Sequence, residues 1–184
     1  HSGEHGDGIV RSEFHEKMFG KKIISSFEQI KDSFDKKNLL NPHKIVRPFK
    51  SDDRSLMRYK SDYKAENIST HYDWSSWGQF SDAVEMCNNN GACRKLDSGV
   101  MCPSYRVTKE EKDLVRGRAN TLRLALSNQL PKDSFVSKGM YETMELCVSC
   151  KACQRECPMS VDMAKMKSEF LSHYYRKFSM SIKD

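Results

Sequence analysis

The sequence lacks a long apolar segment. No run approaches the roughly 18 apolar residues that mark a membrane-spanning helix, and no stretch has the apolar core of a secretory signal. These absences argue against a transmembrane segment and against passage through the secretory pathway. We therefore expect a cytoplasmic protein, with peripheral contact at the inner face of the membrane as an alternative.

Cysteine is absent from the first 86 residues, and the rest of the chain contains an odd number. An odd count without a secretory signal argues against a disulfide framework. Thiolates that hold a metal in a reducing compartment fit better. The seven cysteines are Cys87, Cys93, Cys102, Cys147, Cys150, Cys153 and Cys157.

Apolar residues are also scarce. They make up 38% of the chain against 30% charged residues, and the mean hydropathy is −0.73. Such a composition predicts a small core that is helped by a metal or completed by further chain. The net charge of +6 could suit nucleic acid, an anionic membrane or an acidic redox partner. Because basic and acidic residues are interspersed, we interpret the charge mainly as a solvated surface.

The apolar residues that are present follow helical spacing, which predicts a mostly α fold. In residues 1–47, helices are expected at about 11–19 and 21–34, separated by Gly20, with a short strand through Ile9-Val10. Residues 48–78 have no clear periodicity and are predicted to form a linker or extended arm. Its two tryptophans, Trp74 and Trp77, should dock on a neighbouring surface, since exposed indole is uncommon.

Residues 79–184 are predicted to form a helical cysteine-containing domain. A helix is expected from Phe80 to Met86 and another from about Ser137 to Leu146. Thr108-Lys109-Glu110-Glu111 has the pattern of a capping box and predicts a helix that runs to about Ser127. Ser160 is expected to cap a final helix.

The stretch CVSCKACQRECP at residues 147–158 has the C-x2-C-x2-C-x3-C-P spacing of bacterial ferredoxins. In that pattern three cysteines hold one iron–sulfur cluster and the fourth, here Cys157, serves the other cluster. A structural zinc site is the alternative, but it usually uses two separated C-x2-C pairs. The spacing therefore favours iron–sulfur chemistry.

An irregular copy of the same pattern precedes it: Cys87, Cys93 and then Cys102-Pro103, with Asn90 where a regular motif has cysteine. If the two copies exchange ligands, one [4Fe–4S] cluster is held by Cys102, Cys147, Cys150 and Cys153. Cys87, Cys93 and Cys157 remain for a second cluster. Three thiolates suit a [3Fe–4S] cluster, or a [4Fe–4S] cluster with an open iron or an oxygen ligand from Asn90 or water. The alternative is that these cysteines merely pack.

Arg116-Gly117-Arg118 lies close to the predicted capping box. Residues two apart on a helix face different directions, so both arginines cannot address one partner in the same way. One of them could donate to cluster sulfurs or to a carboxylate. Hydrogen bonds and positive charge near a cluster raise its potential. Surface charge with close helix packing at Gly117 is the alternative.

At this point the chain resembles a known family. GEHGDGIVRSEF at residues 3–14 and FDKKNLLNPHKIV at 34–46 are similar to the end of the FAD-linked oxidase C-terminal domain. That domain occurs in the D-lactate, glycolate and D-2-hydroxyglutarate dehydrogenases of the vanillyl-alcohol-oxidase flavoprotein superfamily. CNNNGACRK, MCPSYR, RGRANTLR and LCVSCKACQRECP resemble the ferredoxin-like segment fused behind it in large bacterial members. The resemblance implies a helical remnant of the oxidase domain followed by a helical two-cluster domain.

The resemblance also implies roles for three residues. Glu4 matches an acidic ligand of a divalent metal, His5 a base for the proton of the substrate 2-hydroxyl, and Asn41 a residue near the flavin. His43 departs from the family's usual glycine before Lys44. FAD, the metal and most of the substrate pocket would belong only to the complete enzyme. The domain that supplies them would be another part of the same chain or a partner subunit.

The leading hypothesis is therefore an electron-transfer segment of an FAD-dependent D-2-hydroxy-acid dehydrogenase, inactive as a dehydrogenase by itself. It would pass electrons from flavin to a downstream acceptor such as a quinone, a heterodisulfide-reductase-like module or a carrier protein. The first alternative is a separate adaptor ferredoxin, which would have no need of GEHGDG. The second is a zinc-stabilised basic module that binds nucleic acid, but no groove-reading motif supports nucleic acid as a partner.

Overall fold

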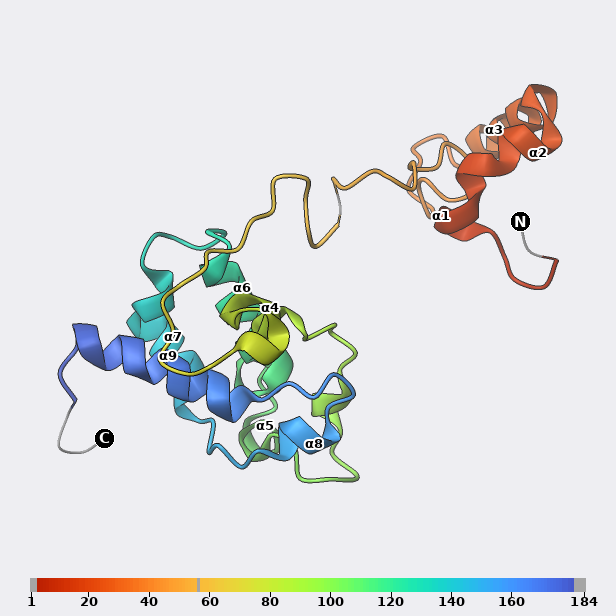
Figure 1. Cartoon of the computed structure of the whole chain (residues 1–184). Helices are drawn as coiled ribbons and strands as arrows, with labels where there is room; N and C mark the ends of the chain where they lie inside the picture. The colour runs from red at the N-terminus through yellow and green to blue at the C-terminus, as the bar shows by residue number, and fades with distance from the viewer. Residues whose placement is uncertain (1–2, 56, 181–184) are drawn as a thin grey trace. The chain divides into compact units, whose positions relative to one another are not determined.

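The computed structural model describes residues 3–55 and 57–180, and it forms two compact units, His1–Tyr63 and Lys64–Asp184. The described residues form helices and 3-10 turns without a strand, so the prediction of a mostly α fold is confirmed. Among these residues, no helix is both long enough and apolar enough to cross a membrane. The helices are labelled in Figure 1.

The first unit is built from three consecutive helices, α1 (Gly8–Arg11), α2 (His15–Phe19) and α3 (Lys21–Phe34), with the 3-10 turn η1 (Ser12–Phe14). Gly20 separates α2 from α3 at a positive φ of 79°, a conformation that glycine adopts without strain. The helices agree with the expected ranges. The short strand predicted through Ile9-Val10 is wrong, because both residues belong to α1.

A loop follows α3 and is tied back to the helices of the first unit by polar contacts. Arg47 pairs with Asp32 through two hydrogen bonds of 2.9 and 2.6 Å. The backbone amide of Ile45 donates to Ser12 Oγ at 3.2 Å. Polar contacts, together with the buried side chain of Val46, therefore hold this loop in place.

The second unit contains α4 (Phe80–Glu85), α5 (Pro103–Thr108), α6 (Val115–Leu126), α7 (Lys138–Glu145), α8 (Ala152–Glu156) and α9 (Met163–Lys177). Short 3-10 turns lie between them: η2 (Ser75–Trp77), η3 (Ala92–Arg94), η4 (Glu111–Asp113) and η5 (Ser134–Val136). Helix α6 contacts α4, α7 and α9 and so forms the centre of the unit (Figure 1). Its buried face carries Ala119, Leu122 and Leu126.

The segment at residues 71–77 docks on α9 of this unit. Trp74 is buried, as predicted, and donates from Nε1 to the fully buried carboxylate of Glu169 at 2.9 Å. The same carboxylate accepts the backbone amides of His71 and Tyr72. The ammonium of Lys165 lies 4.2 Å from the ring centre of Trp74, a cation–π contact. One buried anion thus fixes the chain where it enters the cysteine domain.

Two expected helix starts are wrong. Thr108 ends α5 instead of opening a helix, and α6 begins only at Val115, because Lys109 adopts a left-handed conformation that stops the first helix. Glu111, expected to complete a capping box, pairs instead with Arg116. The final helix is capped by Asp162, which accepts from the Lys165 amide at 3.0 Å, and not by Ser160.

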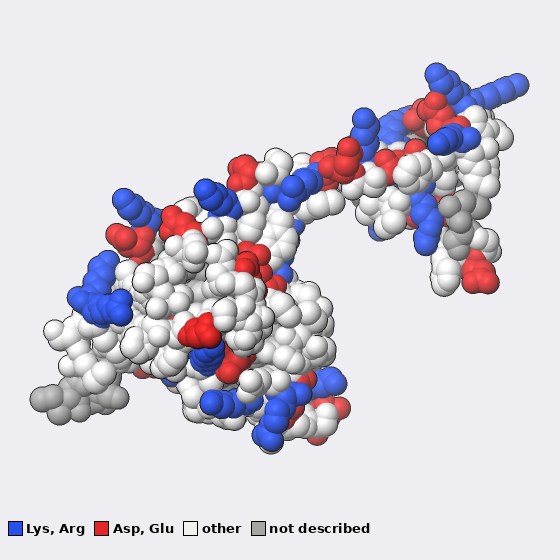
Figure 2. Space-filling view, viewed as in Figure 1, with Lys and Arg blue, Asp and Glu red and all other residues white. Residues whose placement is uncertain are grey.

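Charged side chains of both signs are intermixed on the face of the molecule seen in Figure 2. This mixture agrees with the interpretation of the net positive charge as a property of a solvated surface.

Candidate metal centres

The regular cysteine loop begins between α7 and α8 and continues into α8, which contains Cys153. Ser149 and Lys151 have positive φ angles of 52° and 59°, which turn the chain tightly between the cysteines. The ammonium of Lys167 on α9 donates to the carbonyls of Glu145 and Cys147 at 3.0 and 2.6 Å. The loop is therefore fixed at its start by a lysine from a different helix.

One pocket brings together the four cysteines predicted for the first cluster. Cys147, Cys150 and Cys153 line it from the regular loop, and Cys102 lines it from the residue that precedes α5. Cys150 is exposed, whereas Cys102 and Cys153 are buried. Four thiols around one pocket are the donor set that a [4Fe–4S] cluster uses. The residues of the pocket thus fit the cofactor that the spacing predicted, and the extra ligand comes from the irregular copy.

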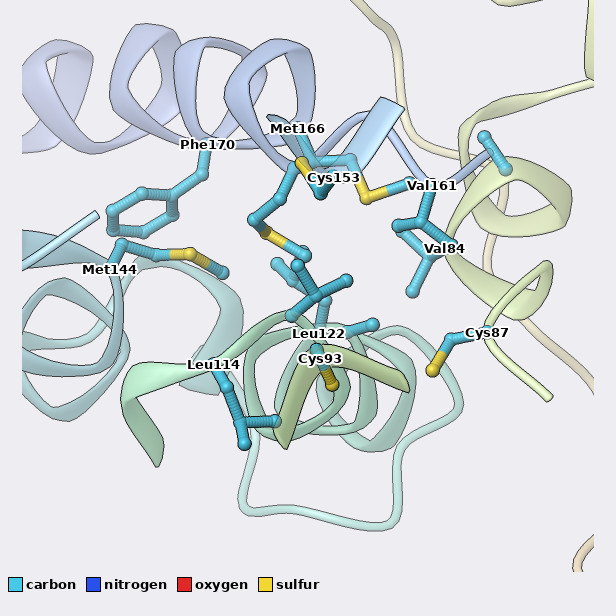
Figure 3. Packing of buried hydrophobic residues seen from close by; sticks show 14 of the residues in the cluster. Val84, Cys87, Cys93, Leu114, Leu122, Met144, Cys153, Val161, Met166 and Phe170 are labelled. Atoms are coloured by element: carbon cyan, nitrogen blue, oxygen red, sulfur yellow. The ribbon is translucent and has the colours of Figure 1, made fainter. Parts of the chain in front are cut away.

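The irregular copy forms a second group of cysteines. Cys87 follows α4 and Cys93 lies in η3, and both are buried in the core beside Val84 and Leu122 (Figure 3). Helix α8, which ends one residue before Cys157, contacts η3. Cys157 itself is half-buried and packs against the same core.

The asparagines between Cys87 and Cys93 have defined partners. Asn90 is exposed, and its Oδ1 accepts the Ala92 amide at 2.8 Å while its Nδ2 donates to Asn88 at 2.5 Å. Its side chain therefore closes a local turn. The amide that touches a cysteine belongs to Asn89, whose Oδ1 lies 3.8 Å from the Cys87 sulfur and accepts from Asn120 at 2.7 Å. No local pattern singles out Asn89, because its partner Asn120 lies on α6.

Within residues 3–55 and 57–180, no three His, Cys, Asp or Glu side chains converge as the ligands of a single metal ion. A zinc ion would need its sulfur ligands at about 2.3 Å from one point. A cluster instead receives each thiolate on a separate iron.

Burial raises the pKa of three of the buried cysteines. It raises the pKa of Cys102 to about 12, although the Val115 amide and the charge of Arg118 act in the opposite direction. Burial likewise raises the pKa of Cys93 and of Cys153. These thiols are neutral at physiological pH, so metal binding must release their protons. The nearby thiols of Cys93 and Cys153 also act to raise the pKa of Cys102.

Backbone amides at two helix starts point at cysteine sulfurs. At the start of α6, the Val115 amide donates to Cys102 Sγ at 3.3 Å and the next amide, that of Arg116, hydrogen-bonds Cys93. At the start of α9, the Met163 amide hydrogen-bonds Cys153. Amides and the positive end of a helix stabilise thiolate charge. The fold thus directs donors at three of the predicted ligands.

The predicted residues of the oxidase remnant lie in loops of the first unit. Glu4 and His5 are largely exposed, and their carboxylate oxygen and ring nitrogen are 3.8 Å apart. Asn41 has a positive φ of 47° and accepts from Lys44 at 3.4 Å. Their roles in metal binding, proton transfer and flavin contact stay predictions.

A buried pair in the same loop was not predicted. Asp7, two residues after His5, contacts His15 Nε2 at 2.8 Å, and both side chains are almost fully enclosed. His15 begins α2, so the pair ties the EHGDG loop to a helix. This contact could not be predicted from the sequence, because the two residues are not at a helical spacing.

In comparisons with known proteins, two separate segments of the chain match different domain families. Residues 1–45 match the C-terminal domain of FAD-linked oxidases, and residues 83–161 match a 4Fe–4S dicluster domain. Relatives called D-2-hydroxyglutarate dehydrogenase in Escherichia coli (strain K12) and Pantoea ananatis are 29% identical across 99% of this chain, and one in Haemophilus influenzae is 30% identical.

The chain spans only about a fifth of these relatives' length: 21% of the E. coli and P. ananatis proteins and 20% of the H. influenzae protein. No solved structure matches it. The chain is thus similar to the C-terminal domain of FAD-linked oxidases over residues 1–45 and to a 4Fe–4S dicluster domain over residues 83–161. Over nearly its whole length it is similar to part of the D-2-hydroxyglutarate dehydrogenases.

Proposed function

We propose that this chain is the electron-transfer segment of an FAD-dependent D-2-hydroxy-acid dehydrogenase and passes electrons from the flavin to an acceptor. The observation that carries the proposal is the single pocket lined by Cys102 together with Cys147, Cys150 and Cys153. Its four thiols suit a [4Fe–4S] cluster, which supplies one-electron transfer when bound. The match to a dicluster domain supports the same assignment.

The residues around this pocket have distinct tasks. Lys167 fixes the start of the cysteine loop through the carbonyl of Cys147. The amides of Val115 and Met163 donate to two of the sulfurs and so favour their thiolate form. Cys102 and Cys153 are enclosed by protein, whereas Cys150 and the neighbouring Val148 reach the surface. The surface at Cys150 is the side from which an acceptor could approach.

For the second site we propose three thiolates, from Cys87, Cys93 and Cys157, and a [3Fe–4S] cluster. The amide oxygen of Asn90 already accepts the Ala92 amide at 2.8 Å, which disfavours it as a fourth ligand. An Asn90→Cys variant tests this assignment, because a fourth thiolate should convert the site toward four irons. An unchanged EPR spectrum and iron content in that variant would argue against position 90 facing the site.

The proposal extends to the dehydrogenase chemistry through the oxidase remnant. We propose that Glu4 binds a divalent metal, that His5 accepts the proton of the substrate 2-hydroxyl, and that Asn41 lies near the flavin. A histidine of ordinary pKa can take up a proton at neutral pH. The similarity to D-2-hydroxyglutarate dehydrogenases favours a D-2-hydroxy acid as the substrate class.

The flavin site and the remaining substrate pocket would then come from additional chain or from a partner subunit. The exposed apolar side chains of the first unit support this, since residues such as Phe34, Leu39 and Leu40 are more than half accessible. We expect them to be buried against the rest of the oxidase domain. The 184 residues alone should not oxidise D-2-hydroxy acids with a dye acceptor, and robust turnover would contradict their assignment as one part of the enzyme.

Anaerobic purification with iron and sulfide analysis tests the central proposal. About seven irons per chain, with one EPR signal in the oxidised sample and another after dithionite, is the expected result for one four-iron and one three-iron cluster. About four irons with no second signal would reject the second cluster. A colourless zinc protein would reject both.

The exchange of ligands is tested by two matched serine variants. Cys102→Ser should remove the signal of the cluster in the regular loop, although Cys102 lies in the irregular copy. Cys157→Ser should remove the other signal and leave the first. The reverse pattern would mean that each copy of the motif holds its own cluster.

A further inference from the structure

The sequence Arg116-Gly117-Arg118 places two arginines at the start of α6, where the two groups of cysteines meet. The backbone of η4 packs so closely here that a Cβ at Gly117 would collide with the backbone of Glu111. The glycine therefore fixes this end of α6 against η4. The two arginines that flank it point to different surroundings.

Arg118 is almost completely buried and lines the pocket formed by Cys102, Cys147, Cys150 and Cys153. Its guanidinium donates to the carbonyls of Thr143 and Asp113 at 2.9 and 2.7 Å and to Ser104 Oγ at 3.2 Å. These three partners hold the group rigidly beside the pocket.

The carboxylate of Asp113, which is fully buried, lies 3.7 Å from the guanidinium of Arg118. Asp113 does not line the pocket, whereas Arg118 does. The positive member of this buried pair is thus the one that lies beside the four cysteines. The carboxylate of Asp113 partly offsets the charge of Arg118.

Arg116 lies beside the other group of cysteines, which contains Cys87 and Cys93. Its Nη1 is packed against Gly91, in the loop that joins Cys87 to Cys93, where an added Cβ would stand 3.2 Å from it. It forms a two-pronged ion pair with Glu111 at 2.5 and 2.9 Å, and this pair is partly exposed. Its charge is therefore better compensated and better screened than that of Arg118.

We propose that Arg118 and Arg116 are positioning charges that set the redox potentials of the two clusters separately, Arg118 at the four-cysteine site and Arg116 at the three-cysteine site. The inference rests on the clusters proposed above. Reduction adds one negative charge to a cluster, so a fixed positive charge beside it stabilises the reduced form and raises the potential. Because Arg118 is buried and Arg116 is paired at the surface, the effect is larger at the four-cysteine site.

The test is a potentiometric titration of the anaerobically purified chain, in which EPR follows the two signals separately. At the wild-type midpoint, Arg118→Gln should lower the reduced-to-oxidised ratio of the four-cysteine cluster about tenfold, which equals 59 mV for one electron. The other cluster should change less than about twofold. Arg118→Lys keeps the charge and should retain most of the ratio.

Arg116→Gln is the matched control on the same helix. It should lower the ratio at the three-cysteine cluster by a smaller factor, about threefold, and leave the four-cysteine cluster unchanged. A ratio within about twofold of wild type in Arg118→Gln would overturn the proposal, as would equal effects of Arg118→Lys and Arg118→Gln. An equal shift of both clusters in either glutamine variant would overturn the separate assignment.

A second variant, Asp113→Asn, tests the same proposal if the Arg118→Gln protein does not bind a cluster. Removing the compensating anion should raise the ratio at the four-cysteine cluster, and a fall would overturn the proposal. Iron and sulfide counts on the wild-type chain separate a failure of the proposed function from a failure of the proposed role of the arginines. A wild-type chain without clusters refutes the proposed function, whereas loaded variants with unshifted potentials refute only the role of the arginines.

Discussion

The two units of this chain are both helical, but they differ in what their helices bury. In Lys64–Asp184, α6 and α9 enclose a continuous core of Leu, Met and Phe side chains. In His1–Tyr63, α3 has no buried residue at all, although its apolar residues recur at helical spacing. The spacing of apolar residues decides that a helix can form, but only a partner surface decides whether its apolar face becomes a core.

The contrast extends to how each unit is held together. The first unit relies on ion pairs, such as the largely enclosed pair of Lys31 with Asp35 and the half-exposed pair of Arg47 with Asp32. Exposed pairs such as the second contribute little to stability. The second unit combines apolar burial with thiols placed to receive clusters, and metal binding adds directly to folding free energy. We therefore expect the second unit to fold on its own and the first to be marginal.

The largest effect is expected when the two units are expressed separately, which tests whether only the second folds on its own. Residues 64–184 expressed alone should retain the iron and sulfide content of the full chain, because all seven cysteines lie there. Residues 1–63 alone should show backbone hydrogen-exchange protection below about tenfold in α3, since short helices without a packed face are marginal. Cooperative unfolding of the isolated first unit would contradict the comparison.

A matched pair of phenylalanines gives the next largest effect. Phe170 on α9 is fully buried, whereas Phe34 at the end of α3 is 87% exposed. Phe170→Ala should lower the free energy of unfolding by about 3 to 5 kcal/mol, and Phe34→Ala should change it by less than about 0.5 kcal/mol. Urea unfolding followed by circular dichroism measures both. Comparable losses would show that Phe34 is packed in solution.

Removal of the buried anion at the entrance to the second unit should have an intermediate effect. Glu169→Gln leaves one oxygen to serve the amides of His71 and Tyr72 and the indole of Trp74, so the unfolding free energy should fall by about 2 to 3 kcal/mol. Tryptophan fluorescence during urea unfolding reports this directly. Glu142→Gln, at an exposed position of α7, is the control and should be neutral.

The same carboxylate predicts a pH dependence. Burial acts to raise the pKa of Glu169, but hydrogen bonds from Trp74, His71, Tyr72 and His173 outweigh it and leave the pKa below the usual 4.5. A lowered pKa means that the carboxylate stabilises the folded state above about pH 4.5 and that this contribution is lost as the pH falls further. The loss should be absent in Glu169→Gln, and an identical acid limb in both proteins would refute it.

The smallest expected effect concerns the end of α3. The Lys31 ammonium, followed by the amides of Leu39 and Leu40, lowers the pKa of Asp35 from 3.8 to about 2. Carbon-detected NMR should find the titration midpoint near 2 and a rise toward 3.8 in Lys31→Met, while Lys36→Met leaves it unchanged. The stabilisation by Asp35 is therefore present above pH 3.8 and is lost as the pH falls toward 2. A midpoint of 3.8 in the parent would show that this contact does not persist in solution.

The sequence predicted the parts of the structure that depend on local spacing. The C-x2-C-x2-C spacing indicated the regular loop, and the Cys-Pro pair at Cys102 indicated the fourth ligand that lines its pocket. The helices at residues 21–34 and 80–85 were also predictable, because their apolar residues follow one helical face.

Features that depend on distant partners were not predictable. Thr108 has the residues of a capping box, but Lys109 turns left-handed and Glu111 pairs with Arg116 instead. Arg118 is buried because η4, α7 and Ser104 pack around it and accept its hydrogen bonds. These partners are distant in the sequence, so no local pattern predicts the contact. The sequence could suggest that the two arginines diverge, yet only the fold assigns each one to a group of cysteines.

The placement of Cys102 opposite the regular loop has a consequence for the topology of the chain. A cluster in that pocket would tie the start of α5 to the loop between α7 and α8, and so close a loop of chain that contains all of α6. A second cluster on Cys87, Cys93 and Cys157 would close a larger loop around the first. Cross-links of this kind reduce the entropy of the unfolded chain. The two clusters would thereby act as cross-links, one inside the loop that the other closes. Loss of either cluster would destabilise the chain that binds the other.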